Sequence, residues 1–150
     1  MEIARLARFL RQHRRVALDT SVFIYQLEAN PKYLGLTSEV FSWLEQPKSR
    51  AVTSTITMTE LLVQPYREGN QSRVDEFYGL LSTFPNLSWV APALEIADTA
   101  ARIRAQHGLR TPDALQAATA IHSAASGLVT NDPVFRRVGE FEAVVLDQFL

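Results

Sequence analysis

The chain has 150 residues, of which 47% are hydrophobic and 21% are charged. This length suits one domain with a real core and is too short for two ordinary ones, and the composition excludes a disordered or collagen-like chain. The absence of cysteine excludes disulfides, thiolate nucleophiles and cysteine-ligated zinc, and a net charge of -1 excludes a chain that is strongly basic as a whole.

The first segment predicts an amphipathic basic helix within residues 1–14. Ile3, Leu6, Phe9 and Leu10 recur at helical spacing, and arginines fill the other faces. Charged residues interrupt the segment every few positions, so it lacks the apolar core of a signal peptide, and no later run is long enough to span a bilayer. We therefore expect a cytoplasmic protein with no membrane partner.

The rest of the chain alternates strands with helices. Strands are predicted at residues 16–18, 50–55, 87–91, 127–130 and 143–146. Helices are predicted at residues 22–28, in a stretch ending near 46–47, at 58–63 where Gln64-Pro65 stops or kinks the helix, after Gly69-Asn70, and at 93–107, 111–125 and 133–137. Such alternation implies right-handed crossovers. We expect a single α/β domain over residues 1–150, with a mainly parallel sheet of four to five strands and helices on both faces.

Four acidic residues stand at element boundaries, and each has a purely structural explanation. Asp19 follows a strand and favours the amino end of the next helix, a stabilisation of roughly 0.3 to 1 kcal/mol. Glu60 follows Thr57 by three residues, the spacing of a capping box. Asp113 falls in the first turn of a helix, and Asp132 precedes a proline, as helix caps often do. No single one of these acids predicts a functional site by itself.

Their joint placement is more informative. Asp19, Glu60 and Asp132 each fall close to the carboxyl end of a predicted strand, and a parallel sheet brings those ends to one edge, where ligands bind in open α/β sheets. The spacing does not force Asp113 to that edge. Carboxylates gathered there would repel each other unless cations were present, and ligation by oxygen alone favours Mg²⁺ or Mn²⁺ over zinc. The reaction that fits is metal-assisted hydrolysis of a phosphodiester.

Four segments of the chain together resemble the PIN-domain family, and within it the VapC-type toxins. They are VALDTSVFIY at residues 16–25, STITMTELL at 54–62, TPDALQAATA at 111–120 and LVTNDPVF at 128–135. Their order and spacing cover nearly all of the chain from Val16 to Leu146. The resemblance implies a three-layer α/β/α sandwich and an endoribonuclease that uses Mg²⁺ or Mn²⁺.

The resemblance also assigns roles position by position. Asp19, Glu60 and Asp113 match the three main catalytic and metal-binding acids of the family, and Asp132 matches the fourth. Thr20, Thr130 and Asn131 are implied to support those carboxylates or to hold a metal-bound water, as residues behind metal ligands commonly do. The VapC likeness further suggests an RNA substrate, a cognate antitoxin, a homodimer and the toxin role of a type II toxin-antitoxin pair.

Two features depart from the VapC pattern. A basic helix of about fourteen residues precedes the first strand, and we expect it to pack on the sheet or to contact RNA. Val134 stands before Phe135, where the family often has an additional acid, so a second metal is expected to bind weakly or only with substrate.

Because a weakly acidic protein must still admit a polyanion, Arg110, Arg136 and Arg137 are expected to steer the RNA backbone.

Three other functions are weighed against the nuclease. A PIN fold that binds RNA or protein without cutting is disfavoured because all four acids are present. An aspartate-nucleophile phosphatase needs a second acid two residues after Asp19, where this chain has Ser21. A nucleotide-binding α/β protein needs a phosphate-cradling loop, but the sequence has neither GxGxxG nor GxxxxGK[ST].

Overall fold

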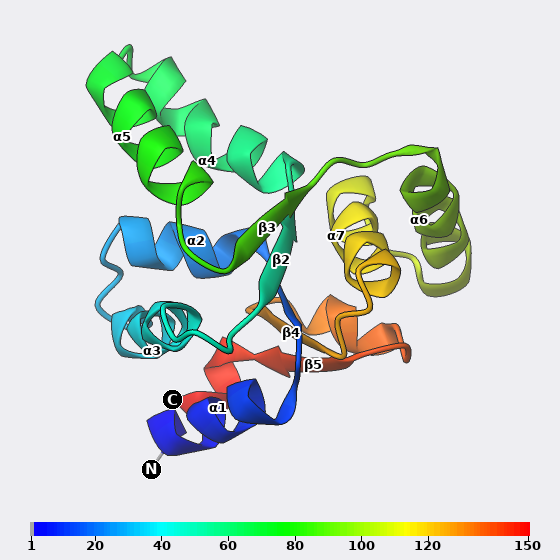
Figure 1. Ribbon diagram of the computed structural model, residues 1–150. Helices are drawn as coiled ribbons and strands as arrows, with labels where there is room; N and C mark the ends of the chain where they lie inside the picture. The colour runs from blue at the N-terminus through cyan, green and yellow to red at the C-terminus, as the bar shows by residue number, and fades with distance from the viewer. Residues whose placement is uncertain (1) are drawn as a thin grey trace.

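The computed structural model describes residues 2–150 and contains one five-stranded sheet (Figure 1). The strands are β1 (Val16–Leu18), β2 (Ala51–Ser54), β3 (Leu87–Val90), β4 (Gly127–Thr130) and β5 (Glu142–Val145), in the spatial order β3-β2-β1-β4-β5. All four neighbouring pairs are parallel. The predicted strands are therefore confirmed: β1 and β4 have the predicted ends, and no end of the other three strands differs by more than one residue. Every carboxyl end lies on the same edge of the sheet.

Within residues 2–150, seven α-helices and two short 3₁₀ helices connect or cover the strands. They are α1 (Glu2–Gln12), α2 (Thr20–Leu27), α3 (Leu34–Leu44), α4 (Ile56–Arg67), α5 (Gln71–Ser82), α6 (Leu94–His107), α7 (Thr111–His122), η1 (Pro133–Arg137) and η2 (Leu146–Phe149). The expected basic helix within residues 1–14 is thus present as α1, and residue 1 of that range lies outside the described residues. Within residues 2–150, no helix has the length and apolarity that crossing a bilayer requires.

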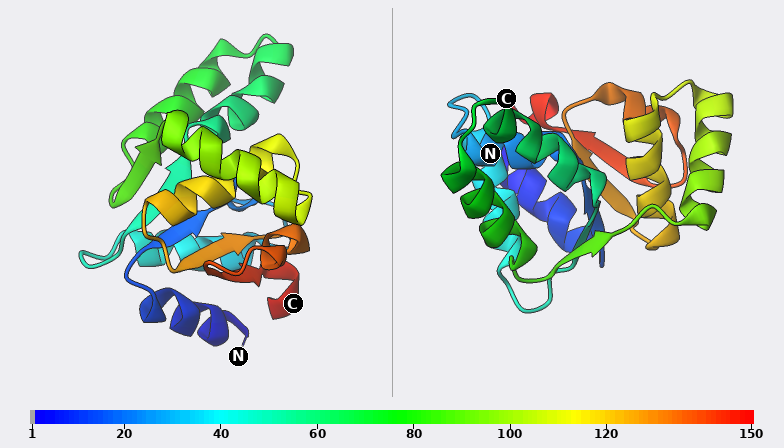
Figure 2. Two further views of the ribbon diagram at one scale, coloured as in Figure 1. Left: turned by 90° about the vertical axis from the view of Figure 1, so that its right-hand side faces the viewer. Right: turned by 90° about the horizontal axis from the view of Figure 1, so that it is seen from above.

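Two hydrophobic cores lie on opposite faces of the sheet, which makes the fold the predicted three-layer α/β/α sandwich (Figure 2). Alternation along β1 shows the arrangement: Val16 and Leu18 belong to the core shared with α1, α2 and α3, whereas Ala17 belongs to the core shared with α6 and α7. Strands buried on both faces explain why the sheet sequences read as continuous apolar runs.

The α4–α5 region differs from its prediction. The sequence suggested a helix that stops or kinks at Gln64-Pro65. The helix does not stop there, since α4 continues through Pro65 to Arg67 and packs against α5 as a protruding helical pair (Figure 1). A proline inside a helix costs about 3 kcal/mol locally. Burial of Pro65, together with the contacts between the two helices, outweighs that cost.

Helix α1 packs tightly on the amino end of β4, at Gly127. A β-carbon added to this glycine would lie 2.8 Å from Cζ of Phe9 and 3.0 Å from the His13 ring. We therefore expect Gly127→Ala to lower the free energy of unfolding by about 1 to 3 kcal/mol, because α1 must shift. Urea denaturation measures the effect.

Gly79→Ala is the matched control for that substitution. Gly79 lies inside α5, and an added β-carbon there meets no atom within 4 Å. Replacing a helical glycine by alanine should raise stability by about 0.5 to 1 kcal/mol. Equal effects of the two substitutions would contradict the close packing of α1.

Candidate metal-dependent nuclease site

The carboxyl edge of the sheet carries the acidic residues singled out in the sequence. Asp19 follows β1 directly and is the N-cap of α2, although its side chain makes no capping hydrogen bond. Asp132 follows β4, and Asp113 lies in the first turn of α7. Glu60 lies one turn into α4, which begins just after β2. The fold thus brings Asp113, which strand spacing left unplaced, to the same region as the others.

Asp19 is the most buried of the four acids, with 8% of its surface exposed. The Thr130 hydroxyl donates to its Oδ2 at 2.8 Å, and the Ser21 hydroxyl donates to the same oxygen at 3.3 Å. Burial, assisted by the nearby charges of Asp113 and Glu60, nevertheless raises the pKa of Asp19 to about 6, against the lowering effect of the hydrogen bonds from the Thr130 hydroxyl and the Thr20 backbone.

Asp113 shares this electrostatic environment. Partial burial raises its pKa above the ordinary value, and the charges of Asp132 and Glu60 act in the same direction, while Arg110 opposes them. Asp19, Asp113, Glu60 and Asp132 are therefore close enough to feel one another's charge. A bound cation would relieve this mutual repulsion.

The side chains are not arranged as a closed coordination shell. Within residues 2–150, no three aspartate, glutamate or histidine side chains lie close enough together to hold a metal ion as they stand. Glu60 and Asp132 are exposed, whereas Asp19 is buried. The donor chemistry still fits Mg²⁺ or Mn²⁺, because all four side chains offer carboxylate oxygens and repel each other without a cation.

The two outer acids are held by specific hydrogen bonds. The Thr20 hydroxyl donates to Oε1 of Glu60 at 2.7 Å. Asp132 accepts a hydrogen bond from the Val134 backbone N–H at 2.9 Å, which caps η1 as the sequence suggested. The capping-box explanation of Glu60 is wrong, since α4 begins at Ile56 and the Glu60 side chain bonds to α2 instead of to its own helix end.

Asn131 connects the site to its surroundings. Its backbone N–H donates to the Ser21 hydroxyl at 3.1 Å, and its side-chain Nδ2 donates to the Tyr25 hydroxyl at 3.0 Å. Its Oδ1 accepts from the backbone N–H of Asp147 at 3.0 Å, which ties η2 to the acidic edge. Thr130, next to it, accepts from the Asp132 backbone N–H while donating to Asp19. Both residues therefore position the carboxylates.

A buried polar network beneath the acids was not predicted from the sequence. Gln116 of α7 is 4% exposed, and its Nε2 donates to the Thr57 hydroxyl at 2.6 Å while its Oε1 accepts from the Ser54 backbone N–H. Thr57 also lies 2.7 Å from the Thr53 hydroxyl and 3.3 Å from that of Thr20. The only sequence signal was a glutamine within an otherwise alanine-rich stretch of helix. The network links α7 to Thr20, the donor to Glu60.

Gln116→Met tests this network. Methionine keeps the size of the side chain but leaves the Thr57 hydroxyl and the Ser54 N–H without that partner, so we expect stability to fall by about 1 to 3 kcal/mol. Chemical denaturation measures the loss. Gln106→Met, at an exposed position on α6, should change stability by less than about 0.5 kcal/mol. A Gln116 variant as stable as the Gln106 variant would show that the network contributes nothing.

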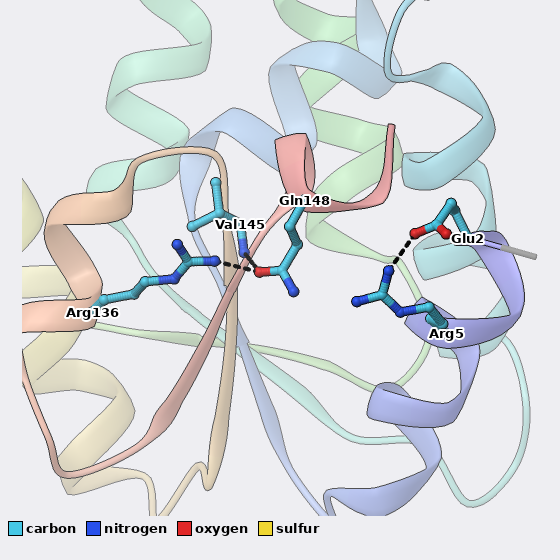
Figure 3. Close-up of polar contacts among 5 residues, drawn as sticks. All are labelled: Glu2, Arg5, Arg136, Val145 and Gln148. Carbon is cyan, nitrogen blue, oxygen red and sulfur yellow. Dashed lines mark hydrogen bonds and ion pairs between the residues drawn. The ribbon is translucent and has the colours of Figure 1, made fainter.

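The arginines expected to steer RNA make contacts within the protein. Arg136 donates through Nη2 to Oε1 of Gln148 at 2.5 Å, and the same oxygen accepts from the Val145 backbone N–H (Figure 3). Arg137 donates to the His107 carbonyl at 3.1 Å. Arg110 is exposed beside Asp113. Their role toward RNA stays a prediction.

The family model of the PIN domain matches residues 16–141. The chain belongs to the PIN-domain family. This match starts at the first residue of β1 and includes all four acids, so the resemblance seen in the sequence is confirmed. A comparison with curated proteins gave no match.

Solved structures of similar fold include several toxin-antitoxin complexes. The VapBC-1 structure from nontypeable Haemophilus influenzae has a TM-score of 0.67 and 24% identity, covering 89% of this chain and 98% of that one. The DNA-bound VapBC from Salmonella typhimurium has a TM-score of 0.67 and 20% identity, covering 88% of this chain and 98% of that one. A toxin-antitoxin complex from Klebsiella pneumoniae has a TM-score of 0.64 and 21% identity, covering 87% of this chain and 97% of that one. At these identities the likeness shows the fold.

Proposed function

We propose that this PIN-domain protein is a metal-dependent endoribonuclease of the VapC type. The observation that carries the proposal is the gathering of Asp19, Glu60, Asp113 and Asp132 at one sheet edge, where two of them have raised pKa values. Membership of the PIN family and the fold shared with toxin-antitoxin complexes support it.

In this proposal some residues bind the cation, and others orient the side chains that bind it. Asp19 and Asp113, with Glu60 and Asp132, would bind Mg²⁺ or Mn²⁺. The cation would supply Lewis acidity toward the phosphodiester and toward the attacking water. Thr130 and Ser21 fix the rotamer of Asp19, and Thr20 fixes that of Glu60, through the hydrogen bonds described above. These hydrogen bonds hold the two carboxylates in place despite the repulsion from the neighbouring acids.

The groove beside the acidic edge suits a protein partner, and we assign it to an antitoxin. About 930 Å³ in volume, it runs along α4 and α5 from Thr55 and Thr59, next to Glu60, to Tyr66 and Tyr78. Tyr66 and Tyr78 are 59% and 55% exposed, so aromatic surface lies open in it. A segment bound there would lie along α4, the helix that carries Glu60. The expected homodimer stays a prediction.

The proposal is tested by incubating the purified protein with total RNA and Mg²⁺ or Mn²⁺ and sequencing the new RNA ends. We expect cleavage at defined positions, which chelation of the metal abolishes. Binding of RNA without cleavage under either metal would instead favour a PIN module that binds but does not cut.

A further inference from the structure

Positive charge is concentrated in the segment that precedes the family match. Residues 1–15 contain five arginines and one glutamate, so their side chains carry +4, and the remaining chain carries -5 because the whole carries -1. The PIN match begins at residue 16. A body with a charge of -5 and an acidic site repels a polyanionic substrate, whereas α1 attracts one.

Helix α1 is fixed to the body by its apolar side, so its basic side faces outward. Leu6, Phe9 and Leu10 are buried in the core shared with α3 and η2. Arg8, Arg11 and Arg14 are exposed and make no hydrogen bond or ion pair with any residue in the range 2–150. Arg8 and Arg11 lie on α1, about 4.5 Å apart along its axis, and Arg14 follows two residues after the helix ends at Gln12. We call these three exposed guanidinium groups the arginine row.

The two end arginines behave differently. Arg5 forms an ion pair with Glu2 at 2.6 Å (Figure 3) and lies over the Phe149 ring of η2. Arg15 donates to the Ser123 carbonyl at 2.5 Å. These contacts help to anchor α1, and they leave the three central arginines as the ones available to a ligand.

A cleft adjoins the carboxyl end of this row. Its volume is about 580 Å³, and it lies between the end of α1 and the connection from α3 to β2. Arg11, Arg14 and Lys48 contribute its cationic lining, while exposed Pro47 and the 8% of Trp43 that remains accessible contribute apolar surface. A cationic rim over an apolar floor suits a nucleotide, whose phosphate and base need those two environments.

Helix α1 connects the arginine row to the neighbourhood of the acidic edge. The end of α1 lies at Gly127, at the amino end of β4. Its first turns lie beside η2, where Arg5 covers Phe149, and η2 is hydrogen-bonded to Asn131 next to Asp132. In Figure 1, α1 and the C-terminal segment lie side by side below the sheet. The amino end of α1 therefore lies beside η2, which is bonded to the acidic edge, and its carboxyl end lies at the amino end of β4.

We propose that α1 is an RNA-holding arm, in which Arg8, Arg11 and Arg14 bind the backbone of a single-stranded segment of the substrate, with one nucleotide in the adjoining cleft. The inference rests on the proposed ribonuclease function. RNA is favoured over an acidic protein because the three cations are all arginine, the side chain best suited to phosphate, and because two of them line the adjoining cleft.

The test compares two triple variants that lose the same charge. Arg8→Gln/Arg11→Gln/Arg14→Gln removes the row, and Arg67→Gln/Arg73→Gln/Arg102→Gln removes three exposed arginines on α4, α5 and α6. Binding of a fluorescein-labelled 20-nucleotide oligouridylate is measured by anisotropy in EDTA, over a series of salt concentrations. We expect the row variant to bind at least tenfold more weakly, and the control variant less than threefold.

The salt dependence gives an independent readout. Loss of three phosphate contacts should reduce the slope of log K against log salt concentration by about 2, since each contact to a single strand contributes about 0.7. The Arg→Lys triple at the same three positions should recover most of the binding, which excludes a folding defect. Equal weakening of the two glutamine triples would overturn the inference.

The failure of this inference is distinguishable from failure of the nuclease proposal. If the unmodified protein binds and cuts RNA with Mg²⁺, and the row variant binds as tightly as it does, the arm is refuted while the ribonuclease stands. If the unmodified protein neither binds nor cuts RNA, both are refuted.

Discussion

Asp19→Asn should reduce metal-dependent RNA cleavage by about 10³-fold. Asp19 is the buried acid on which Thr130 and Ser21 converge, and asparagine keeps its shape while removing its charge. A catalytic cation contributes several kcal/mol of transition-state stabilisation, and each 1.36 kcal/mol corresponds to tenfold in rate. Without the Asp19 carboxylate as a ligand, the cation should lose most of this transition-state stabilisation. The measurement is the single-turnover cleavage rate at saturating Mg²⁺ or Mn²⁺.

Asp98→Asn is the matched control for cleavage. Asp98 is exposed on α6 and belongs to none of the contacts at the acidic edge, so this variant should cut RNA at the rate of the unmodified protein. If Asp19→Asn kept more than about a tenth of the rate, Asp19 would not be a principal metal ligand.

The same substitution should stabilise the metal-free protein. In the folded state the pKa of Asp19 is about 6, against an ordinary value of 3.8 in the unfolded chain. Ionised Asp19 therefore opposes folding above pH 6, by up to about 3 kcal/mol. As the pH falls from about 6 to about 4, the folded state takes up a proton that the unfolded state does not, and stability rises. The pKa of Asp113 is also raised, so protonation of Asp113 likewise increases stability as the pH falls.

Urea denaturation in EDTA between pH 7.5 and pH 4.5 tests this linkage. Asp19→Asn should be more stable than the unmodified protein at pH 7.5, with a difference that shrinks toward pH 4.5. Mg²⁺ or Mn²⁺ should stabilise the unmodified protein at pH 7.5 and should have little effect on the variant. A variant less stable than the unmodified protein at pH 7.5 would contradict the account of the site's electrostatics.

The fold was largely predictable because its signals are local. Runs such as Val16-Ala17-Leu18 are apolar on both sides, as in buried parallel strands, and Gly108 ends α6 with the positive φ of 73° that glycine accepts readily. The α4–α5 pair was predicted less well, since the continuation of α4 through Pro65 depends on packing against α5. That contact is tertiary and has no local signature.

The site was predictable only in part. Strand ends placed three acids at one edge, and the family resemblance assigned Asp113. The sequence did not indicate how the acids are held. The polar network around Gln116 joins residues more than fifty positions apart in the chain, and the bond from Thr20 to Glu60 joins two helices. Such pairings depend on how distant segments pack in the fold. The capping interpretation of Glu60 considered only its own helix and was therefore wrong.

The most direct test of the central claim is anomalous diffraction from crystals of this protein grown with Mn²⁺. The account predicts a manganese peak at the carboxyl edge of the sheet, coordinated by Asp19 and Asp113, which disappears in Asp19→Asn. Manganese absent from that edge at saturating concentration, or bound only at other surfaces, would show that these acids do not form a metal site.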